Sequence, residues 1–314
     1  MLCFYFKKEK LIKNFAFLGV MLVVFVSFKC TKEEAKPEPV IVSVDFYNRM
    51  LFIDQQNYQI KTSESATFKK LSTNPNFTIS ESGLITQTTI NVVHEIEATW
   101  TADGTKTKFF VLAASGTADK NHYLRGWKYI EKLYETDTTR AIVIRHAEAI
   151  VGTDGETLPA STNWWTSCDS KLARQLSENG RKQSEYYGTV FKGVKMPIKK
   201  VFASEFCRAK QTAELMNLGL PITVDKRING HFYNVSGVTS DVGMIKILEE
   251  QVATKGLLML AAHYDISAGI SKMGTLDMAD SFFMKIGVDK KTAFQGIVSY
   301  PMWRAYYEIE LSKK

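Results

Sequence analysis

The stretch that decides the fold is Arg140-Ala-Ile-Val-Ile-Arg-His-Ala-Glu148, in which a β-branched apolar run ends in a cation and an imidazole. A second apolar run, Leu257-Leu-Met-Leu-Ala-Ala-His263, also ends in a histidine, and Arg208 follows a third strand-like segment at 198–203. Strands of a parallel sheet that are buried on both faces have continuous apolar sequences of this kind. Helical segments lie between them, so the sequence predicts an α/β fold.

The polar residues that follow these runs predict a phosphate site. Ligands of open α/β sheets bind beyond the carboxyl ends of the strands, so Arg145, His146, Arg208 and His263 are expected to gather at one edge. An arginine fork matches the oxygens of a phosphoryl group, and a neutral imidazole can attack phosphorus. A strand-end imidazole also needs a partner on its other nitrogen, typically a backbone carbonyl.

These residues resemble the histidine phosphatase superfamily, which includes phosphoglycerate mutases and acid phosphatases. The matching pieces follow the family's order: Arg145-His146-Ala-Glu148, Gln175-Leu-Ser-Glu-Asn-Gly-Arg-Lys-Gln183, Ser204-Glu-Phe-Cys-Arg208-Ala-Lys-Gln-Thr-Ala213 and Ala262-His263. The resemblance implies a three-layer α/β/α histidine-phosphatase-like domain over 118–314. It also implies a phosphomonoester hydrolase that needs no metal or other cofactor. In that mechanism His146 attacks phosphorus, and Arg145, Arg208 and His263 hold the equatorial oxygens.

The sequence departs from the mutase pattern at the acid that protonates the leaving group. Mutase-like members place a glutamate two residues after an Arg-Leu pair, whereas Arg227-Ile-Asn-Gly230 places a glycine there, followed by His231. Asp265, two residues after His263, is our candidate for this acid. The alternatives are His231 or no dedicated acid. Glu148 is expected to support the site rather than to donate the proton.

A second reading of the function belongs to a different class. In this reading the chain is a non-catalytic surface protein that binds a phosphorylated ligand or a glycan. The presence of both His146 and Arg208 favours the enzyme. The sequence predicts a phosphorylated small-molecule substrate and does not name it.

The N-terminus predicts export. Lysines precede the apolar stretch at 15–28, which is short for a membrane span of about 20 residues. We expect a signal peptide over 1–29 and a polar tether over 30–37. Cys30 at the end of the apolar core resembles a bacterial lipoprotein processing site, and Lys32-Glu33-Glu34 resembles the export tag of some surface lipoproteins. The prediction is an outer-membrane lipoprotein of the cell envelope, attached to the membrane through lipidated Cys30.

The charge distribution argues against a nucleic-acid partner. The formal net charge is +7, but residues 1–29 carry five lysines and one glutamate. The rest of the chain has no basic block, so a nucleic-acid surface is not expected.

The remaining cysteines of an exported chain can pair. Cys168 lies in the loop after the first predicted core strand, and Cys207 directly precedes Arg208, so both are expected near the rim of the same pocket. A disulfide persists in an oxidising compartment. Two free buried thiols are the equal alternative.

Residues 38–116 predict an all-β domain. Short β-branched or aromatic segments at 40–46, 77–80, 90–100 and 108–113 alternate with turn signals. The piece Phe77-Thr-Ile-Ser-Glu-Ser-Gly-Leu-Ile-Thr86 resembles bacterial immunoglobulin-like domains, which are β-sandwiches. This domain is expected to act as a spacer or to contact a surface glycan or protein. His94 is expected to face solvent or to pair across strands.

Helical spacing and caps organise the remainder of the chain. Helices are expected over 121–134, after an N-cap at Ser177, over 208–216, and over 241–254 with Asp241 as cap. The alternating segments at 294–300 and 305–311 predict an edge hairpin.

Overall fold

The computed structural model describes residues 38–152, 154–155, 158–229, 238–267, 270 and 276–314. Residues 39–314 form one compact unit. The predicted signal peptide, Cys30 and the tether lie outside the described residues. Among the described residues, no helix is long and apolar enough to cross a membrane.

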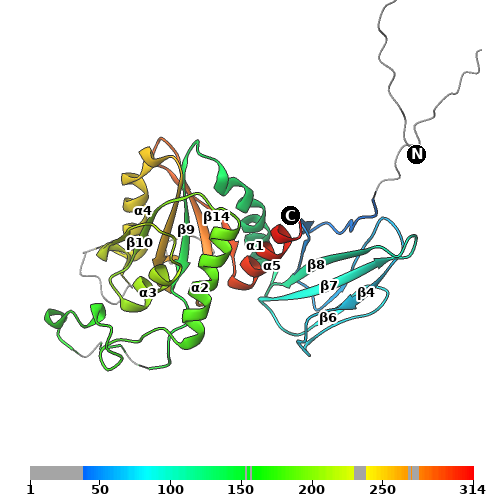
Figure 1. Cartoon of the computed structure of the whole chain (residues 1–314), viewed down its shortest axis with the longest axis horizontal. Coiled ribbons are helices and arrows are strands. Elements are labelled where there is room, and N and C mark those ends of the chain that lie inside the picture. Colours follow the sequence, from blue (N-terminus) through cyan, green and yellow to red (C-terminus); the bar gives the residue numbers. More distant parts are fainter. Residues whose placement is uncertain (1–37, 153, 156–157, 230–237, 268–269, 271–275) are drawn as a thin grey trace, which may run out of the picture. The chain divides into compact units, whose positions relative to one another are not determined.

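A mixed six-stranded sheet forms the centre of the C-terminal part (Figure 1). Its strand order is β11-β10-β12-β9-β13-β14, in which β11, β10, β12 and β9 are parallel and β13 and β14 are antiparallel. The bounds are β9 Thr139–Arg145, β10 Ile198–Ala203, β11 Ile222–Val224, β12 Leu257–Ala262, β13 Ser281–Ile286 and β14 Thr292–Val298. The apolar runs form the central strands β9 and β12, as predicted, and every residue of β12 is buried.

Helices cover this sheet. Helix α2 contacts both α3 and α5, and α1 packs against β13 and β14. The bounds are α1 Thr117–Tyr129, α2 Glu178–Gly193, α3 Cys207–Leu215, α4 Ser240–Glu250 and α5 Tyr300–Leu311. The Ser177 side chain accepts a hydrogen bond from Gly180 N–H, so the predicted N-cap of α2 is confirmed. The mixed α/β fold is therefore confirmed.

The N-terminal part is built from strands in two sheets. One sheet has the order β1-β2-β8-β7-β4 and the other β3-β6-β5. The bounds are β1 Phe46–Tyr47, β2 Met50–Ile53, β3 Asn57–Gln59, β4 Ala66–Lys70, β5 Phe77–Ile79, β6 Leu84–Gln87, β7 Val92–Trp100 and β8 Lys106–Ala113.

Alternate residues of β2 face two different cores. Leu51 and Ile53 pack among the side chains of the β-sheets. Met50 and Phe52 belong to the large core of the α/β part, where the Phe52 ring lies 6.5 Å from that of Trp127. Because successive strand residues point to opposite faces, this one strand joins both halves of the chain in a continuous packing.

The predicted hairpin at 294–311 is wrong. Strand β14 pairs with β13, a strand that the sequence analysis did not anticipate, and residues 300–311 form α5. The buried positions of that segment recur at helical spacing, with Pro301 in the first turn. They are Met302, Trp303, Ala305, Tyr306 and Ile309. The alternation of Tyr307-Glu308-Ile309-Glu310-Leu311 is local, whereas the helical spacing of buried residues runs from Met302 to Ile309.

Two smaller expectations also fail. Residues 40–46 do not form one strand, because Ile41 makes an isolated bridge with Thr62 and a turn closes from Phe46 N–H to the Ser43 carbonyl. Asp241 is not the cap of α4; it lies in the first turn, where its carboxylate faces the positive end of the helix dipole.

His94 is buried rather than exposed to solvent. Its ring stacks on Phe77 with centroids 3.9 Å apart, and Nδ1 lies 3.4 Å from Ser72 Oγ. Burial lowers the pKa of His94 to about 4, so the ring is neutral and behaves as a core aromatic.

Candidate active site

The two ring nitrogens of His146 have different partners. Its backbone N–H donates to the Ala262 carbonyl at 2.8 Å, which fixes the residue beside the end of β12. Nδ1 lies 2.8 Å from the Ala147 carbonyl, which can only accept, so the proton is on Nδ1. Nε2 is then unprotonated and accepts from Arg208 Nε at 3.2 Å. The expected backbone partner is present, and the nitrogen with the lone pair faces a guanidinium.

His263 follows the end of β12 and lies beside His146, with ring centroids 5.3 Å apart. Its Nε2 is 2.8 Å from Ser204 Oγ, which also accepts from Phe206 N–H. The Phe206 ring packs edge-on against the imidazole at 4.6 Å. Both histidines are buried. The ends of two parallel strands therefore bring the two predicted histidines into one buried site.

Arg208 is the second residue of α3, and its guanidinium lies over the Phe206 ring at 4.5 Å. One turn later, Thr212 donates to the Arg208 carbonyl and accepts from Ala147 N–H at 3.0 Å. Thr212 thereby ties α3 to the residue after His146. This explains why a threonine four residues after the arginine belongs to the motif.

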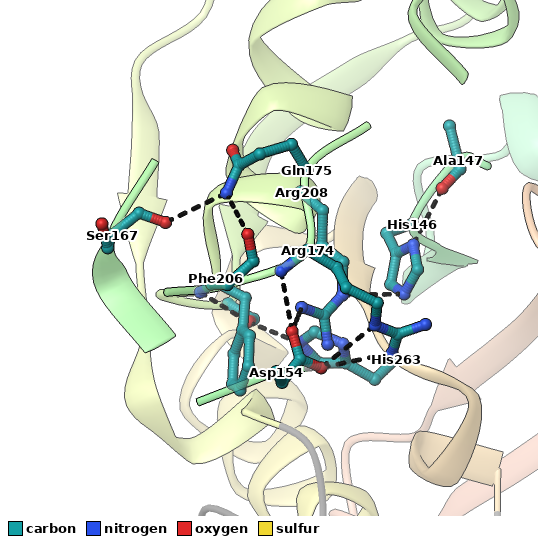
Figure 2. A network of polar contacts seen from close by, with 11 residues as sticks. His146, Ala147, Asp154, Ser167, Arg174, Gln175, Phe206, Arg208 and His263 are labelled. Atoms are coloured by element: carbon teal, nitrogen blue, oxygen red, sulfur yellow. Dashed lines mark hydrogen bonds and ion pairs between the residues drawn. The ribbon is translucent and has the colours of Figure 1, made fainter. Parts of the chain in front are cut away.

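Two residues that the sequence analysis missed complete the cluster: Asp154 and Arg174 (Figure 2). Asp154 Oδ1 accepts from Arg208 Nη1 at 3.0 Å and from Arg174 N–H at 2.9 Å. Its Oδ2 accepts from Arg174 Nε and Nη2 at 3.3 and 3.2 Å. Arg174 immediately precedes the motif at 175–183. Asp154 lies in a loop with no motif or periodicity.

Arg145 ends β9 and approaches the site from the β13 side. Its N–H donates to the Asp280 carbonyl at 2.9 Å, and Nη1 donates to the Leu276 carbonyl. The guanidinium carbon is 5.6 Å from the Tyr264 ring. All four residues predicted from strand ends and α3, together with Arg174, therefore surround one centre.

The site keeps both imidazoles neutral. Burial lowers the pKa of His146 well below its ordinary value, and the Arg208 and Arg145 charges lower it further. Burial likewise lowers the pKa of His263, with the same arginines contributing. A neutral imidazole is a nucleophile, and the surplus of guanidinium over carboxylate charge matches a dianionic phosphoryl group.

This lowered pKa predicts the acid side of the pH profile. Because a neutral His146 is required and its folded-state pKa is depressed, kcat/KM should not fall with an apparent pKa near 6.5, the ordinary value. The acidic limb should lie at lower pH. A pH–rate profile with two substrates whose phosphates have different second pKa values separates substrate titration from that of the enzyme. A limb near 6.5 common to both substrates would contradict the prediction.

Glu148 has a structural role at the start of α2. Its carboxylate accepts from Ser177 Oγ at 2.6 Å and from Asn179 Nδ2 at 2.8 Å, which lowers its pKa. A Cβ at Gly180 would lie 2.0 Å from the Glu148 carbonyl, so only glycine allows this approach. Glu148 thus joins the segment after His146 to α2, as expected.

The 150–175 loop is fastened against α3. Cys168 and Cys207 form a disulfide with Cα atoms 5.3 Å apart, which decides between the two cysteine alternatives. Trp164 and Trp165 are buried with Phe206 in a small separate core. The disulfide therefore holds the loop that carries Asp154 beside the residue that precedes Arg208.

We expect reduction of this disulfide to destabilise the chain. The bond joins residues separated by 39 positions, and loop-closure entropy for that length corresponds to about 4 kcal/mol, with about 2–4 kcal/mol typical. The free energy of unfolding of a Cys168→Ser, Cys207→Ser variant should fall by that amount in denaturant melts. Reductant should destabilise the wild type and leave the double variant unchanged. Equal stability of the two chains would contradict the prediction.

Asp265 lies in the 3-10 turn η7 (Tyr264–Ser267), which directly follows β12, and its side chain is buried. Gly230 and His231, the other positions considered for the acid, lie outside the described residues. Asp265 is two residues after His263 in the chain, and its role as acid stays a prediction.

Comparison with protein families gives a match within the α/β part. Residues 141–243 match the family model of the histidine phosphatase superfamily, branch 1. Comparison with curated proteins gives no match.

Several solved structures are similar to half of the chain. A protein histidine phosphatase SixA complexed with tungstate is 20% identical, with a TM-score of 0.38, covering 51% of this chain and 97% of its own. A mycobacterial glucosyl-3-phosphoglycerate phosphatase is 17% identical, with a TM-score of 0.37, covering 51% of this chain and 98% of its own. A phosphoserine phosphatase mutant from Entamoeba histolytica is 12% identical, with a TM-score of 0.37, covering 52% of this chain and 98% of its own.

The family match includes the end of β9 with His146, the loop with Arg174, and helix α3 with Arg208. His263, after β12, lies outside the matched residues. The α/β part of this chain is therefore similar to the histidine phosphatase superfamily over residues 141–243.

Proposed function

We propose that the chain hydrolyses phosphomonoesters through a phosphohistidine at His146, without a metal ion. The observation that carries the proposal is the orientation of the His146 ring, whose Nδ1 is held by the Ala147 carbonyl while Nε2 faces Arg208. Nε2 attacks phosphorus, an N–P bond forms, and the P–O bond to the alcohol breaks. Arg145, Arg208 and His263 stabilise the charge on the equatorial oxygens.

Water then attacks the phosphohistidine, the N–P bond breaks, and inorganic phosphate leaves with His146 restored to its neutral form. The departing alcohol takes up a proton in the first step. We assign this proton to Asp265, which is buried two residues after His263, and the carboxylate left behind takes up a proton from the attacking water in the second step.

Release of inorganic phosphate from a panel of monoesters tests the activity. A general acid matters most for a poor leaving group, so Asp265→Asn should slow hydrolysis of alkyl phosphates far more than hydrolysis of p-nitrophenyl phosphate. Equal losses on both would point to a positioning role for Asp265. No loss on either would assign the proton to His231 or to solvent. If wild type releases no phosphate from any monoester, the chain is the non-catalytic ligand-binding protein instead.

We also propose that the chain is an exported lipoprotein of the outer membrane, anchored at Cys30. The support is the lysine-flanked apolar stretch at 15–28 that ends next to this cysteine. Metabolic labelling with a fatty acid should mark the wild type and spare Cys30→Ser. A free N-terminus downstream of Cys30 would show a secreted soluble protein.

We propose further that the strands of 38–116 form an immunoglobulin-like module that contacts a surface glycan or protein. The support is the packing of a five-stranded sheet against a three-stranded one. A glycan array probed with the exported chain tests the contact. Failure to bind would leave these strands with the role of a spacer.

A further inference from the structure

Asp154 is a buried carboxylate at the centre of the site, and the mechanism above gives it no part. Its side chain is 4% exposed and that of Arg208 is 5% exposed. Its two oxygens accept from Arg208 and from three nitrogens of Arg174. Burial of a carboxylate costs desolvation free energy, which the hydrogen bonds and ion pairs to that carboxylate must offset.

The side of the Arg208 guanidinium that binds Asp154 determines which edge of it is left for the phosphoryl group. In arginine, the Nε hydrogen and Nη2 lie on one edge of the plane, and Nη1 points to the other side, next to Cδ. Arg208 Nε points at His146 Nε2, while Nη1 binds Asp154. The carboxylate is therefore on the opposite side from the nucleophile. The Nε–Nη2 edge, which can bind two phosphoryl oxygens at once, faces the nitrogen that attacks.

The carboxylate is itself held in place. The backbone N–H of Arg174 donates to Oδ1, and that residue lies within the segment closed by the Cys168–Cys207 disulfide, six positions after Cys168. The buried indole of Trp165 donates from Nε1 to Glu205 Oε2 at 3.0 Å, which fixes the same loop to the segment before α3. A site residue whose support is fixed in this way can set the orientation of its partner.

We propose that Asp154 is a positioning residue for phosphoryl transfer. It directs the Nε–Nη2 edge of Arg208 toward the phosphoryl group on His146 Nε2, and it keeps Arg174 at the same centre. This inference rests on the proposed phosphatase function. The competing idea is that the carboxylate is an internal anion that substrate must displace, and the opposite-edge geometry disfavours it.

Asp154→Asn removes the charge at nearly constant shape. We expect kcat to fall by about 10- to 100-fold, because small misplacements of a binding group have effects of this size. Orthovanadate, whose trigonal form imitates the transferring group, should bind at least about fivefold more weakly by calorimetry, because the arginine fork is misaligned. An unchanged kcat, or vanadate binding that is unchanged or tighter, would overturn the proposal in favour of a competing anion.

Asp169→Asn is the matched control. Asp169 lies in the same loop, is exposed, and caps a turn through Lys171 N–H, so this variant should keep wild-type kcat and vanadate affinity. If Asp154→Asn does not give folded protein, Asp154→Ser replaces it with the same expectations, since its hydroxyl can still accept from a backbone N–H.

A double-mutant cycle separates an effect through Arg208 from a general one. In an Arg208→Lys background, Asp154→Asn should lower kcat by less than about threefold, because coupled residues are not additive. Full additivity would overturn the proposal. If the wild type proves inactive on every monoester, the phosphatase function fails, while vanadate binding still compares Asp154→Asn with wild type.

Discussion

Replacement of His146 by alanine is expected to lower kcat at least about a thousandfold, as the removal of a covalent catalyst does. The expectation follows from the ring's fixed tautomer, since Nδ1 is bound to the Ala147 carbonyl and only Nε2 has a lone pair directed at the site.

The measurement is phosphate release together with mass spectrometry of enzyme quenched without acid, since phosphohistidine is labile to acid. Phosphate should be found on His146 in the wild type and be lost in the variant. His122→Ala is the control, because His122 packs on Phe294 away from the site and should not affect the rate. Phosphate on another residue would refute the assignment of the nucleophile.

Arg208→Lys is expected to lower kcat/KM by about a hundredfold to a thousandfold, although the charge is kept. Loss of one preorganised donor to a developing oxyanion has an effect of this size. Lysine cannot bind Asp154 on one side and direct a fork at the phosphoryl group on the other, and it loses the stacking on Phe206.

Arg304→Lys provides the control for Arg208→Lys. Arg304 lies over the Tyr186 ring at 5.8 Å and has no part in the site, so its replacement should leave kcat/KM unchanged. Melting temperatures of both variants separate loss of fold from loss of function. Near-normal kinetics of Arg208→Lys in a folded protein would show that Arg208 is structural.

The central strands and the four strand-end and helix-start residues could be predicted from the sequence, because a strand buried on both faces leaves a continuous apolar run. The strands and the helix at the β13–β14 edge of the sheet could not be predicted in this way. Strand β13 follows a stretch without a turn motif, and α5 contains a short alternating piece inside a longer helical period. Such ambiguity is resolved by what the segment packs against, which is tertiary information.

Asp154 and Arg174 could not be found for a different reason. Neither follows a core strand, and their loop has no periodic pattern. The loop reaches the site through a disulfide and two buried tryptophans, and the sequence alone left the pairing of Cys168 undecided. Residues that a loop brings to a site depend on how the loop is fastened, and local sequence does not encode that.

The two-faced strand β2 has a practical consequence for work with this chain. A fragment cut near residue 117, where α1 begins, would remove Met50 and Phe52 from the large core and expose Trp127 to water. Such a fragment should aggregate even though every residue of the site is retained. The shortest well-behaved enzyme should therefore start before β1. Force applied to its first strands would act directly on the core that packs against the six-stranded sheet.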